Sequence, residues 1–410
     1  HLRCPQLLLA GNIPGESPGT GGGGSAPKPA TPMARGPDGK GGGAGFSLAD
    51  QLFNADSAAA LAQEFSVLPG FEAGRFLDQV LPRFEGLGVH ARLEVLADGL
   101  EAKLPNDFNA MAESLEASLP EPLDPARKDD DFGRFIHAVH GVLAARHGID
   151  HPERALDLIH AATQRFSMEY AIRPFLNRWP DLVLARMQGW ARDPHYHVRR
   201  LVSEGTRPKL PWGIGITLDP RAPLPLLDVL HADDTRFVTR SVANHLNDLS
   251  KTHPDAVLDR LAAWRSSQAQ TPRERDWITR HALRTAVKRG EPGALGLLGY
   301  RPDLPVTARL DIQPELRIGE VLTIAASLES PEAGPVLVDY RLRFARPTGS
   351  AEKVFKLKAA ELAPGKPLTL TKRHRMKGDA TTFRLHPGVH AVILQVNGRD
   401  VAEAEFTLLA

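Results

Sequence analysis

The chain has 410 residues, enough for two or three domains, and its 42% hydrophobic and 24% charged residues are ordinary for a globular protein. The net charge of +1 carries no information on partners, and the single cysteine, Cys4, excludes an internal disulfide and a zinc site built from cysteines. No apolar run reaches the ~18–20 residues that span a bilayer, so we expect a cytoplasmic protein without membrane contact.

Residues 1–45 consist mainly of Gly, Pro, Ser and Ala, in stretches such as GTGGGGSAPKPATP and GKGGGAG. Segments with so few apolar residues cannot bury enough surface to offset the entropy lost on ordering. The sequence therefore predicts a disordered tail, in which Met33 is a candidate for the first translated residue. The apolar LLLA near the beginning is too short for the core of a signal peptide.

Residues 46–300 show apolar residues at three- and four-residue spacing, which predicts a series of amphipathic helices. Part of this region repeats at intervals of 40 residues, so that Val198, Val238 and Ile278 share one repeat position. A period of about 40 residues with paired helices is typical of a HEAT-like solenoid, whose stacked repeats form an extended concave surface. We therefore predict a HEAT-like helical repeat domain over residues 46–300.

Polar residues recur at the same period. Glu204 has Asn244 and Arg284 as its counterparts 40 and 80 residues further on. The three side chains would stack along one ridge of the solenoid, as the polar groups of a binding groove do. They are equally consistent with solvent-facing positions at helix ends, and the repeat by itself leaves both interpretations open.

After Gly299 the apolar period changes from helical to alternating, and short strand patterns are separated by Gly, Pro and Asn turns. The pentapeptide VNGRD is a strong hairpin signal, because Asn-Gly supplies the positive φ angles of a type I′ turn. About seven short strands without cysteines predict a small Ig-like β-sandwich over residues 304–410. The predicted fold class is thus an α-helical HEAT-like repeat solenoid followed by an all-β Ig-like sandwich.

The predicted sandwich has an uneven charge. Between Arg341 and Lys377 there are 11 Lys or Arg residues and two acidic residues. Such an excess is typical of a phosphate-binding surface, so we predict DNA contacts in this segment by Lys372, Arg373 and Arg375. The alternative is a solubilising face on a half-exposed sheet.

The stretch HVRRLVSEGTRPKLPWG, residues 197–213, combines a helix end with charge and an aromatic residue. Glu204 is surrounded in sequence by cations, and nearby opposite charge keeps a carboxylate ionised. Basic walls around a recessed carboxylate suit a ligand that has phosphates and a positively charged centre. Trp212 follows on a stiff, proline-containing loop, and the alternative interpretation of this residue is a core tryptophan at a corner.

A second candidate carboxylate, Glu169, lies in RFSMEYAIRPFLNRWP, which we predict as a broadly apolar helix. An acidic residue is hard to explain on such a helix, although an ordinary ion pair with Arg173, four residues on, is the alternative. His195 and His197 form an H-x-H pair without a third ligand nearby in sequence, so we predict no metal site. P-loop, GxSxG and HExxH motifs are missing, and no cofactor is expected.

Several of these segments resemble the AlkC branch of the HEAT-like DNA alkylation repair glycosylases. The resemblance is carried by EYAIRPFL, HVRRLVSEGTRPKLPW, SVANHLND and WITRHALRTAVKRG, and it extends from Phe46 to Gly299. An appended Ig-like domain also occurs in that branch. The resemblance implies monofunctional hydrolysis of the N-glycosidic bond of cationic alkylated bases, N3-methyladenine and N3-methylcytosine, in double-stranded DNA during base excision repair, without base flipping.

The resemblance also implies roles for individual residues. Glu169 and Glu204 would be the acidic pair that stabilises an oxocarbenium-like sugar and positions water, and Trp212 would be the aromatic residue against that sugar. The Ig-like domain would grip the DNA as a second module. From position, charge and repeat, the predicted DNA-binding residues of the helical part are Arg173, Arg200, Arg207, Lys209, Arg240, Asn244 and Arg284.

Two other functions are consistent with the fold class. One is a non-catalytic HEAT-repeat protein that binds damaged or bent DNA in a salt-sensitive way without releasing bases. The other is a protein-interaction scaffold, against which the basic strand segment argues, and no obligate protein partner is evident. The long motif match favours the glycosylase, for which we expect Glu204→Gln to abolish base release while DNA affinity falls little or even rises.

Overall fold

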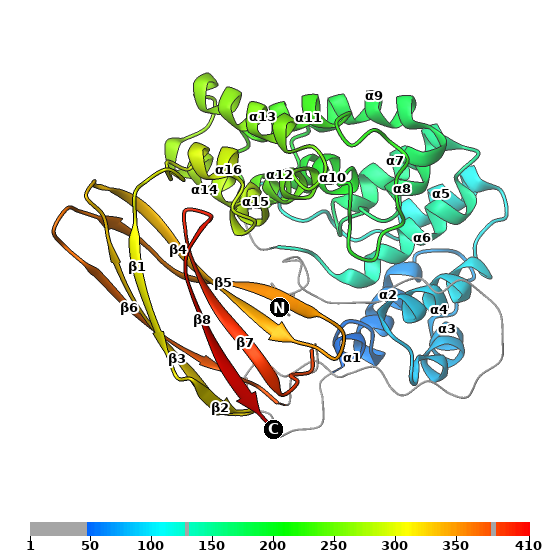
Figure 1. Ribbon diagram of the computed structural model, residues 1–410. Helices are drawn as coiled ribbons and strands as arrows, with labels where there is room; N and C mark the ends of the chain where they lie inside the picture. The colour runs from blue at the N-terminus through cyan, green and yellow to red at the C-terminus, as the bar shows by residue number, and fades with distance from the viewer. Residues whose placement is uncertain (1–46, 128–130, 379–382) are drawn as a thin grey trace. The chain divides into compact units, whose positions relative to one another are not determined.

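The computed structural model describes residues 47–127, 131–378 and 383–410 (Figure 1). The predicted tail, with Cys4 and Met33, lies outside the described residues. The chain divides into two compact units, one up to Asp248 and one from Leu249 to Ala410. None of the described helices is both long enough and apolar enough to cross a membrane.

The first unit consists of short α-helices and two short 3-10 helices, labelled η2 and η3 (Figure 1). Their starts are encoded locally, since Asn54 and Ser57 form a reciprocal capping box at one helix and Asp107 caps another. The helices are α1 (Leu48–Leu52), α2 (Ala55–Phe65), α3 (Ala73–Val80), η2 (Leu81–Phe84), α4 (Val89–Glu101), α5 (Phe108–Ala117), η3 (Phe135–His137), α6 (Ala138–His147), α7 (Pro152–Thr163), α8 (Ile172–Arg178), α9 (Pro180–Trp190), α10 (Tyr196–Gly205), α11 (Leu224–Leu230) and α12 (Arg236–Leu249).

The predicted 40-residue repeat corresponds to α10 and α12 in this unit. Val198 of α10 and Val238 of α12, which share a repeat position, are both fully buried. Helix α8 packs against α9, and α10 packs against α11. Paired helices of this kind are the building unit of HEAT-like repeats, so the predicted helical class is confirmed.

The second unit contains both helices and strands. Its helices are α13 (Pro254–Ser267), α14 (Pro272–Ala282), α15 (Arg284–Lys288) and α16 (Pro292–Leu297). Its strands are β1 (Thr307–Ile312), β2 (Glu315–Arg317), β3 (Val321–Glu329), β4 (Gly334–Ala345), β5 (Ser350–Leu362), β6 (Leu368–Arg375), β7 (Gly388–Val396) and β8 (Arg399–Leu409). The change from helix to strand falls near residue 300, whereas the compact units divide after Asp248, so α13 to α16 belong to the unit that contains the strands.

The described strands form two sheets, with the orders β1-β3-β6 and β2-β8-β7-β4-β5. Strand β2 pairs with β8 in parallel, and the other pairs are antiparallel. Leu322 of the first sheet shares one buried core with Tyr340 and Phe406 of the second. The sheets therefore pack face to face, as in the predicted Ig-like sandwich. The structure describes eight strands in this region, where the sequence predicts about seven.

The hairpin between β7 and β8 turns at Asn397 and Gly398, which have φ angles of 49° and 79°, as the VNGRD pattern predicts. The buried Asn397 side chain accepts a hydrogen bond from the backbone N–H of Leu337 and donates one to the carbonyl group of Arg301, both at 2.8 Å. A Cβ atom on Gly398 would lie 2.6 Å from Cα of Gly290. This turn is therefore fixed against the chain that follows α15 in the same unit.

Gly133 is a point at which the first unit tolerates no side chain. Its φ is +71°, and a Cβ atom would lie 1.8 Å from the carbonyl oxygen of Arg165. We expect Gly133→Ala to destabilise the protein by at least about 3 kcal/mol. The matched control is Gly189→Ala in α9, where the added methyl group meets nothing within 4 Å and should stabilise the helix by about 0.5–1 kcal/mol. Thermal unfolding measures the difference, and equal melting temperatures would contradict it.

Candidate active site

Glu169 lies in an irregular segment between the end of α7 and the start of α8. The predicted helix through this residue is wrong, because Phe166 forms a β-bridge with Gly133, an extended pairing that a helix excludes. The alternative prediction, an ion pair between Glu169 and Arg173 four residues on, is also wrong. Its carboxylate pairs with Arg200, 31 residues further along the chain.

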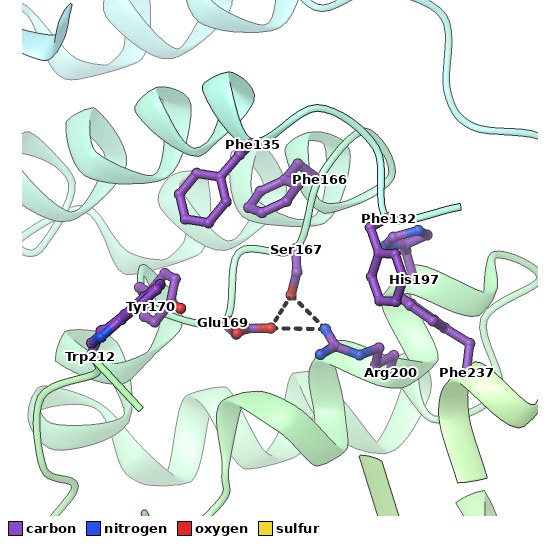
Figure 2. A pocket seen from close by; sticks show the side chains of 10 residues that line it. All are labelled: Phe132, Phe135, Phe166, Ser167, Glu169, Tyr170, His197, Arg200, Trp212 and Phe237. Carbon is purple, nitrogen blue, oxygen red and sulfur yellow. Dashed lines mark hydrogen bonds and ion pairs between the residues drawn. The ribbon is translucent and has the colours of Figure 1, made fainter. Parts of the chain in front are cut away.

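The described hydrogen bonds to the Glu169 carboxylate all end on one of its two oxygens, Oε2. Its Oε2 accepts a hydrogen bond from Oγ of Ser167 at 2.9 Å and another from Nη1 of Arg200 at 2.8 Å (Figure 2). The same Nη1 lies 3.1 Å from Oγ of Ser167, so the three groups form a closed triangle. No described residue donates a hydrogen bond to Oε1, and Glu169 lines a pocket. One carboxylate oxygen is therefore left to interact with a group that enters this pocket.

Glu204 lies in the last turn of α10 and is 2% exposed. Its Oε1 accepts a hydrogen bond from Nη1 of Arg207 at 2.7 Å and lies 3.6 Å from Nη2 of Arg200. Its Oε2 accepts a hydrogen bond from Oγ of Ser241 at 2.5 Å. Arg207 also pairs with Asp248 at 2.8 Å. Both oxygens of Glu204 are thus occupied by protein groups, and Arg200 bridges the two candidate carboxylates.

The charges of this network set its protonation states. Burial by itself would raise the pKa of Glu204, but the nearby Arg207 and Arg200 outweigh burial and lower that pKa to about 2. Burial and the negative charge of Glu169 raise the pKa of Tyr170. At neutral pH, Glu204 is therefore ionised and Tyr170 retains its proton.

The pocket that Glu169 lines has mostly aromatic walls. Its aromatic residues include Phe132, Phe135, Phe166, Tyr170, Trp212 and Phe237 (Figure 2). The Arg200 guanidinium group lies 4.8 Å from the centre of the Phe237 ring. Aromatic faces carry partial negative charge, so these walls together with the Glu169 carboxylate favour a cationic group inside the pocket.

Trp212 has a φ angle of +63°, a left-handed backbone conformation that is rare for a bulky residue. Its side chain is 42% exposed, so the alternative interpretation as a core tryptophan is wrong. Its ring lies edge-on to His90, with centroids 5.7 Å apart. Left-handed non-glycine residues cost ~1–3 kcal/mol and are concentrated at functional sites, which agrees with the position of Trp212 at the pocket.

Three predicted phosphate contacts need correction. Arg173, Arg200 and Arg207 are only 1%, 4% and 7% exposed. Arg200 and Arg207 pair with carboxylates, and Arg173 donates hydrogen bonds to backbone carbonyl groups. Buried guanidinium groups with these partners hold the site together and have no free surface for a phosphate. The buried cations beside Glu204 therefore keep that carboxylate ionised and in place.

The other predicted DNA-binding residues of the first unit differ in exposure. Lys209 is exposed, and the half-buried Arg240 lines a small recess together with Glu204 and Asn244. Glu204 and Asn244, at 2% and 7% exposure, are not solvent-facing residues at helix ends. The first two positions of the predicted ridge thus line one recess beside the network.

In the second unit, the half-buried Arg284 donates a hydrogen bond to the carbonyl group of His281. The predicted cations of β6 are exposed, and this set consists of Lys372, Arg373 and Arg375. The basic segment is only partly neutralised by neighbours, since Arg341 and Arg343 pair with acidic residues at its beginning.

Three residues of the network are not among those predicted from the sequence. They are Ser167, Ser241 and Asp248, which bind Glu169, Glu204 and Arg207. The motif SVANHLND contains two of them, so the signal is present. Their partners lie 37 and 41 residues away for Ser241 and Asp248, and spacing along the sequence does not reveal such pairs.

His195 and His197 bind backbone groups. Nε2 of His195 lies 2.9 Å from the carbonyl oxygen of Leu123, and Nε2 of His197 lies 2.8 Å from that of Asp131. Burial lowers the pKa of His197 to about 3, so its neutral ring donates a hydrogen bond through Nε2. His197 thus binds the residue directly before Phe132, which lines the pocket. Among the described residues, no group of three or more potential metal ligands occurs.

The chain is similar to known proteins along most of its length. Residues 307–410 match the family model described as the C-terminal Ig-like domain of the uncharacterised protein YhaZ. The chain is also 32% identical over 355 residues to YhaZ of Bacillus subtilis (strain 168), a match that covers 83% of this chain and 93% of YhaZ.

A solved structure resembles both the helical and the strand regions. It is the Pseudomonas fluorescens alkylpurine DNA glycosylase AlkC bound to DNA containing an abasic site analog, with a TM-score of 0.78 and 34% sequence identity. The match covers 89% of this chain and 100% of the AlkC chain. The chain therefore belongs to the AlkC-type family of HEAT-like repeat DNA alkylation repair glycosylases that carry a C-terminal Ig-like domain.

Proposed function

We propose that this protein hydrolyses the N-glycosidic bond of cationic alkylated bases in double-stranded DNA, with N3-methyladenine and N3-methylcytosine as substrates. The proposal rests on one arrangement, in which Arg200 joins two buried carboxylates, Glu169 and Glu204, beside an aromatic-walled pocket. The likeness to AlkC supports the same class of reaction and the same kind of partner.

The chemistry of such substrates requires little general-acid catalysis. A base that is already cationic leaves as a neutral molecule, so the enzyme need not deliver a proton to it. Positive charge with oxocarbenium character develops on the deoxyribose instead. A carboxylate beside the sugar stabilises that charge and orients a water molecule for attack. Glu169 suits this role because its Oε1 accepts no hydrogen bond from a described residue.

Glu204 suits a supporting role, since both of its oxygens are already bonded. Its charge compensates Arg200 and Arg207, which keeps Arg200 on the Oε2 side of Glu169. The electron-rich face of Trp212 adds stabilisation to the cationic sugar. Because a cationic base needs no proton from the enzyme and the stabilising groups act on the sugar, the chemistry does not require a flipped-out base, and we propose a reaction without base flipping.

The exposed cations of β6 are proposed to contact DNA phosphates. We expect Arg373→Gln to weaken binding to any duplex and to reduce the magnitude of the slope of log affinity against log salt by about 0.9, the value for one phosphate contact. The charge-matched control is Lys103→Gln, which removes an exposed cation just after α4 and should leave the slope unchanged. Equal slopes for wild type and Arg373→Gln would remove this residue from the DNA interface.

The function is tested by base release under single-turnover conditions from a duplex that contains N3-methyladenine. Wild-type protein is expected to release the methylated base and to leave an abasic site in intact strands. Salt-sensitive duplex binding without release would mean that the fold recognises damaged or bent DNA without catalysis. In that case the enzymatic proposal fails.

A further inference from the structure

Arg173 joins three backbone carbonyl groups, one at the end of α10 and two in the loop that follows it. Its Nε donates a hydrogen bond to the carbonyl group of Ile214 at 2.6 Å. Its Nη1 donates to those of Gly205 at 3.0 Å and Arg207 at 2.9 Å. These carbonyl groups lie on both sides of Trp212 in the sequence. One buried guanidinium group therefore closes the loop that carries Trp212.

The conformation of Trp212 needs such closure. A left-handed bulky residue is strained and persists only where surrounding contacts hold the backbone. The Trp212 side chain is 42% exposed, so its own burial supplies only part of that hold. The next residue packs tightly on the loop closure, since a Cβ atom on Gly213 would lie 3.1 Å from Cβ of Leu210 and 3.2 Å from Cδ of Arg173.

Helix α8 binds the same loop at a second point. One turn after Arg173, Nδ2 of Asn177 donates a hydrogen bond to the carbonyl group of Gly215, and its Oδ1 accepts one from the N–H of Thr217, both at 2.9 Å. The helix begins at Ile172, directly after the segment that carries Glu169. One short helix thus determines where the candidate carboxylate and the tryptophan loop lie relative to each other.

We propose that Arg173 is a positioning residue that holds Trp212 at the pocket beside Glu169, an inference that rests on the proposed glycosylase function. Its planar group reaches carbonyl groups before and after Trp212 at once, through Nη1 to Gly205 and Nε to Ile214. A lysine keeps the positive charge but replaces this fork by one compact ammonium group, which cannot reproduce the same geometry.

The first test measures the mobility of the Trp212 side chain by fluorescence and does not depend on enzymatic activity. Trp212 emission is obtained by subtracting the spectrum of each protein's Trp212→Phe counterpart, which removes the signal of the other four tryptophans. We expect the fluorescence anisotropy of Trp212 to fall in Arg173→Lys and in Arg173→Gln, and to stay near the wild-type value in Arg154→Lys. The control variant changes an arginine of α7 that pairs with Glu116 instead of binding this loop. Unchanged anisotropy in both Arg173 variants would overturn the inference.

The second test separates positioning from general stability. We expect Arg173→Lys to lower kcat for base release by about 10–100-fold with little change in KM, the size of effect that a misplacement of about 1 Å produces. The same substitution in a Trp212→Ala background should cause no further loss, because it acts through the tryptophan. An equal loss in both backgrounds would overturn the inference.

The two tests also distinguish the inference from the function on which it rests. If wild-type protein releases no base, the proposed function fails, and anisotropy alone decides whether Arg173 holds the loop. If wild type is active and Arg173→Lys has a much lower melting temperature, the measurements on Arg173→Lys in the wild-type and Trp212→Ala backgrounds are repeated. They are then made well below that lower melting temperature. Anisotropy and double-mutant coupling then report on folded protein only.

Discussion

Glu169→Gln is expected to lower the single-turnover rate of N3-methyladenine release by about a thousandfold, a loss of about 4 kcal/mol in transition-state stabilisation. The amide keeps the size and shape of the carboxylate, and its oxygen still accepts the hydrogen bond from Arg200. What disappears is the negative charge beside the pocket, which the developing sugar cation requires. Duplex affinity should be unchanged or slightly higher, because the substitution removes a charge that repels phosphate.

The matched control is Glu116→Gln in α5. Glu116 also pairs with an arginine, since Arg154 donates hydrogen bonds to its two oxygens at 2.6 and 2.8 Å, but it does not line the pocket. Rates of this variant should remain within about twofold of wild type. If Glu169→Gln retained more than a tenth of the wild-type rate, Glu169 would not be the carboxylate that stabilises the sugar.

Glu204→Gln is expected to have its largest effect on stability. The folded-state pKa of Glu204, about 2, lies below the ordinary value of 4.5. A carboxylate with a depressed pKa contributes stability that is fully present above its unfolded value and is lost as pH falls through its folded value. The difference in free energy of unfolding between wild type and Glu204→Gln should therefore be on the order of 3 kcal/mol above pH 5. It should shrink as the pH falls from about 4.5 toward 2.

Urea unfolding followed by circular dichroism, at several pH values from 8 to 3.5, measures this difference. Glu116→Gln again serves as the control, because its partly exposed ion pair should contribute less than about 1 kcal/mol. Equal stability of wild type and Glu204→Gln at pH 7 would contradict the assignment of Glu204 as a buried, paired anion. A difference that grows on acidification would contradict it as well.

The sequence predicts the architecture well because periodicity is a local property. The change from three- and four-residue spacing to alternation correctly separates helices from strands, and the Asn397-Gly398 turn is specified by its own two residues. Glu169 shows the limit of this approach. The residues around it have helical apolar spacing. The backbone of Phe166 nevertheless pairs with that of Gly133, 33 residues earlier, in a β-bridge, and Glu169 lies outside any helix.

The roles of cations are the least predictable part of the site. Charge is visible in the sequence, but the partner of each charge is not. Arg173, Arg200 and Arg207 look like phosphate ligands by position, yet the fold gives them carbonyl groups and carboxylates far away in sequence. Lys372 and Arg373 are consecutive in β6 and so point to opposite faces of the strand, yet both are exposed, which alternation along a strand does not predict.

Four titratable groups in and beside the pocket have pKa values shifted away from the physiological range. The pKa of Glu204 is lowered to about 2 and that of His197 to about 3, whereas those of Tyr170 and Arg200 are raised. Each of these groups thus keeps a single protonation state throughout the physiological range. The electric field that these four groups contribute to the pocket is consequently constant over that range.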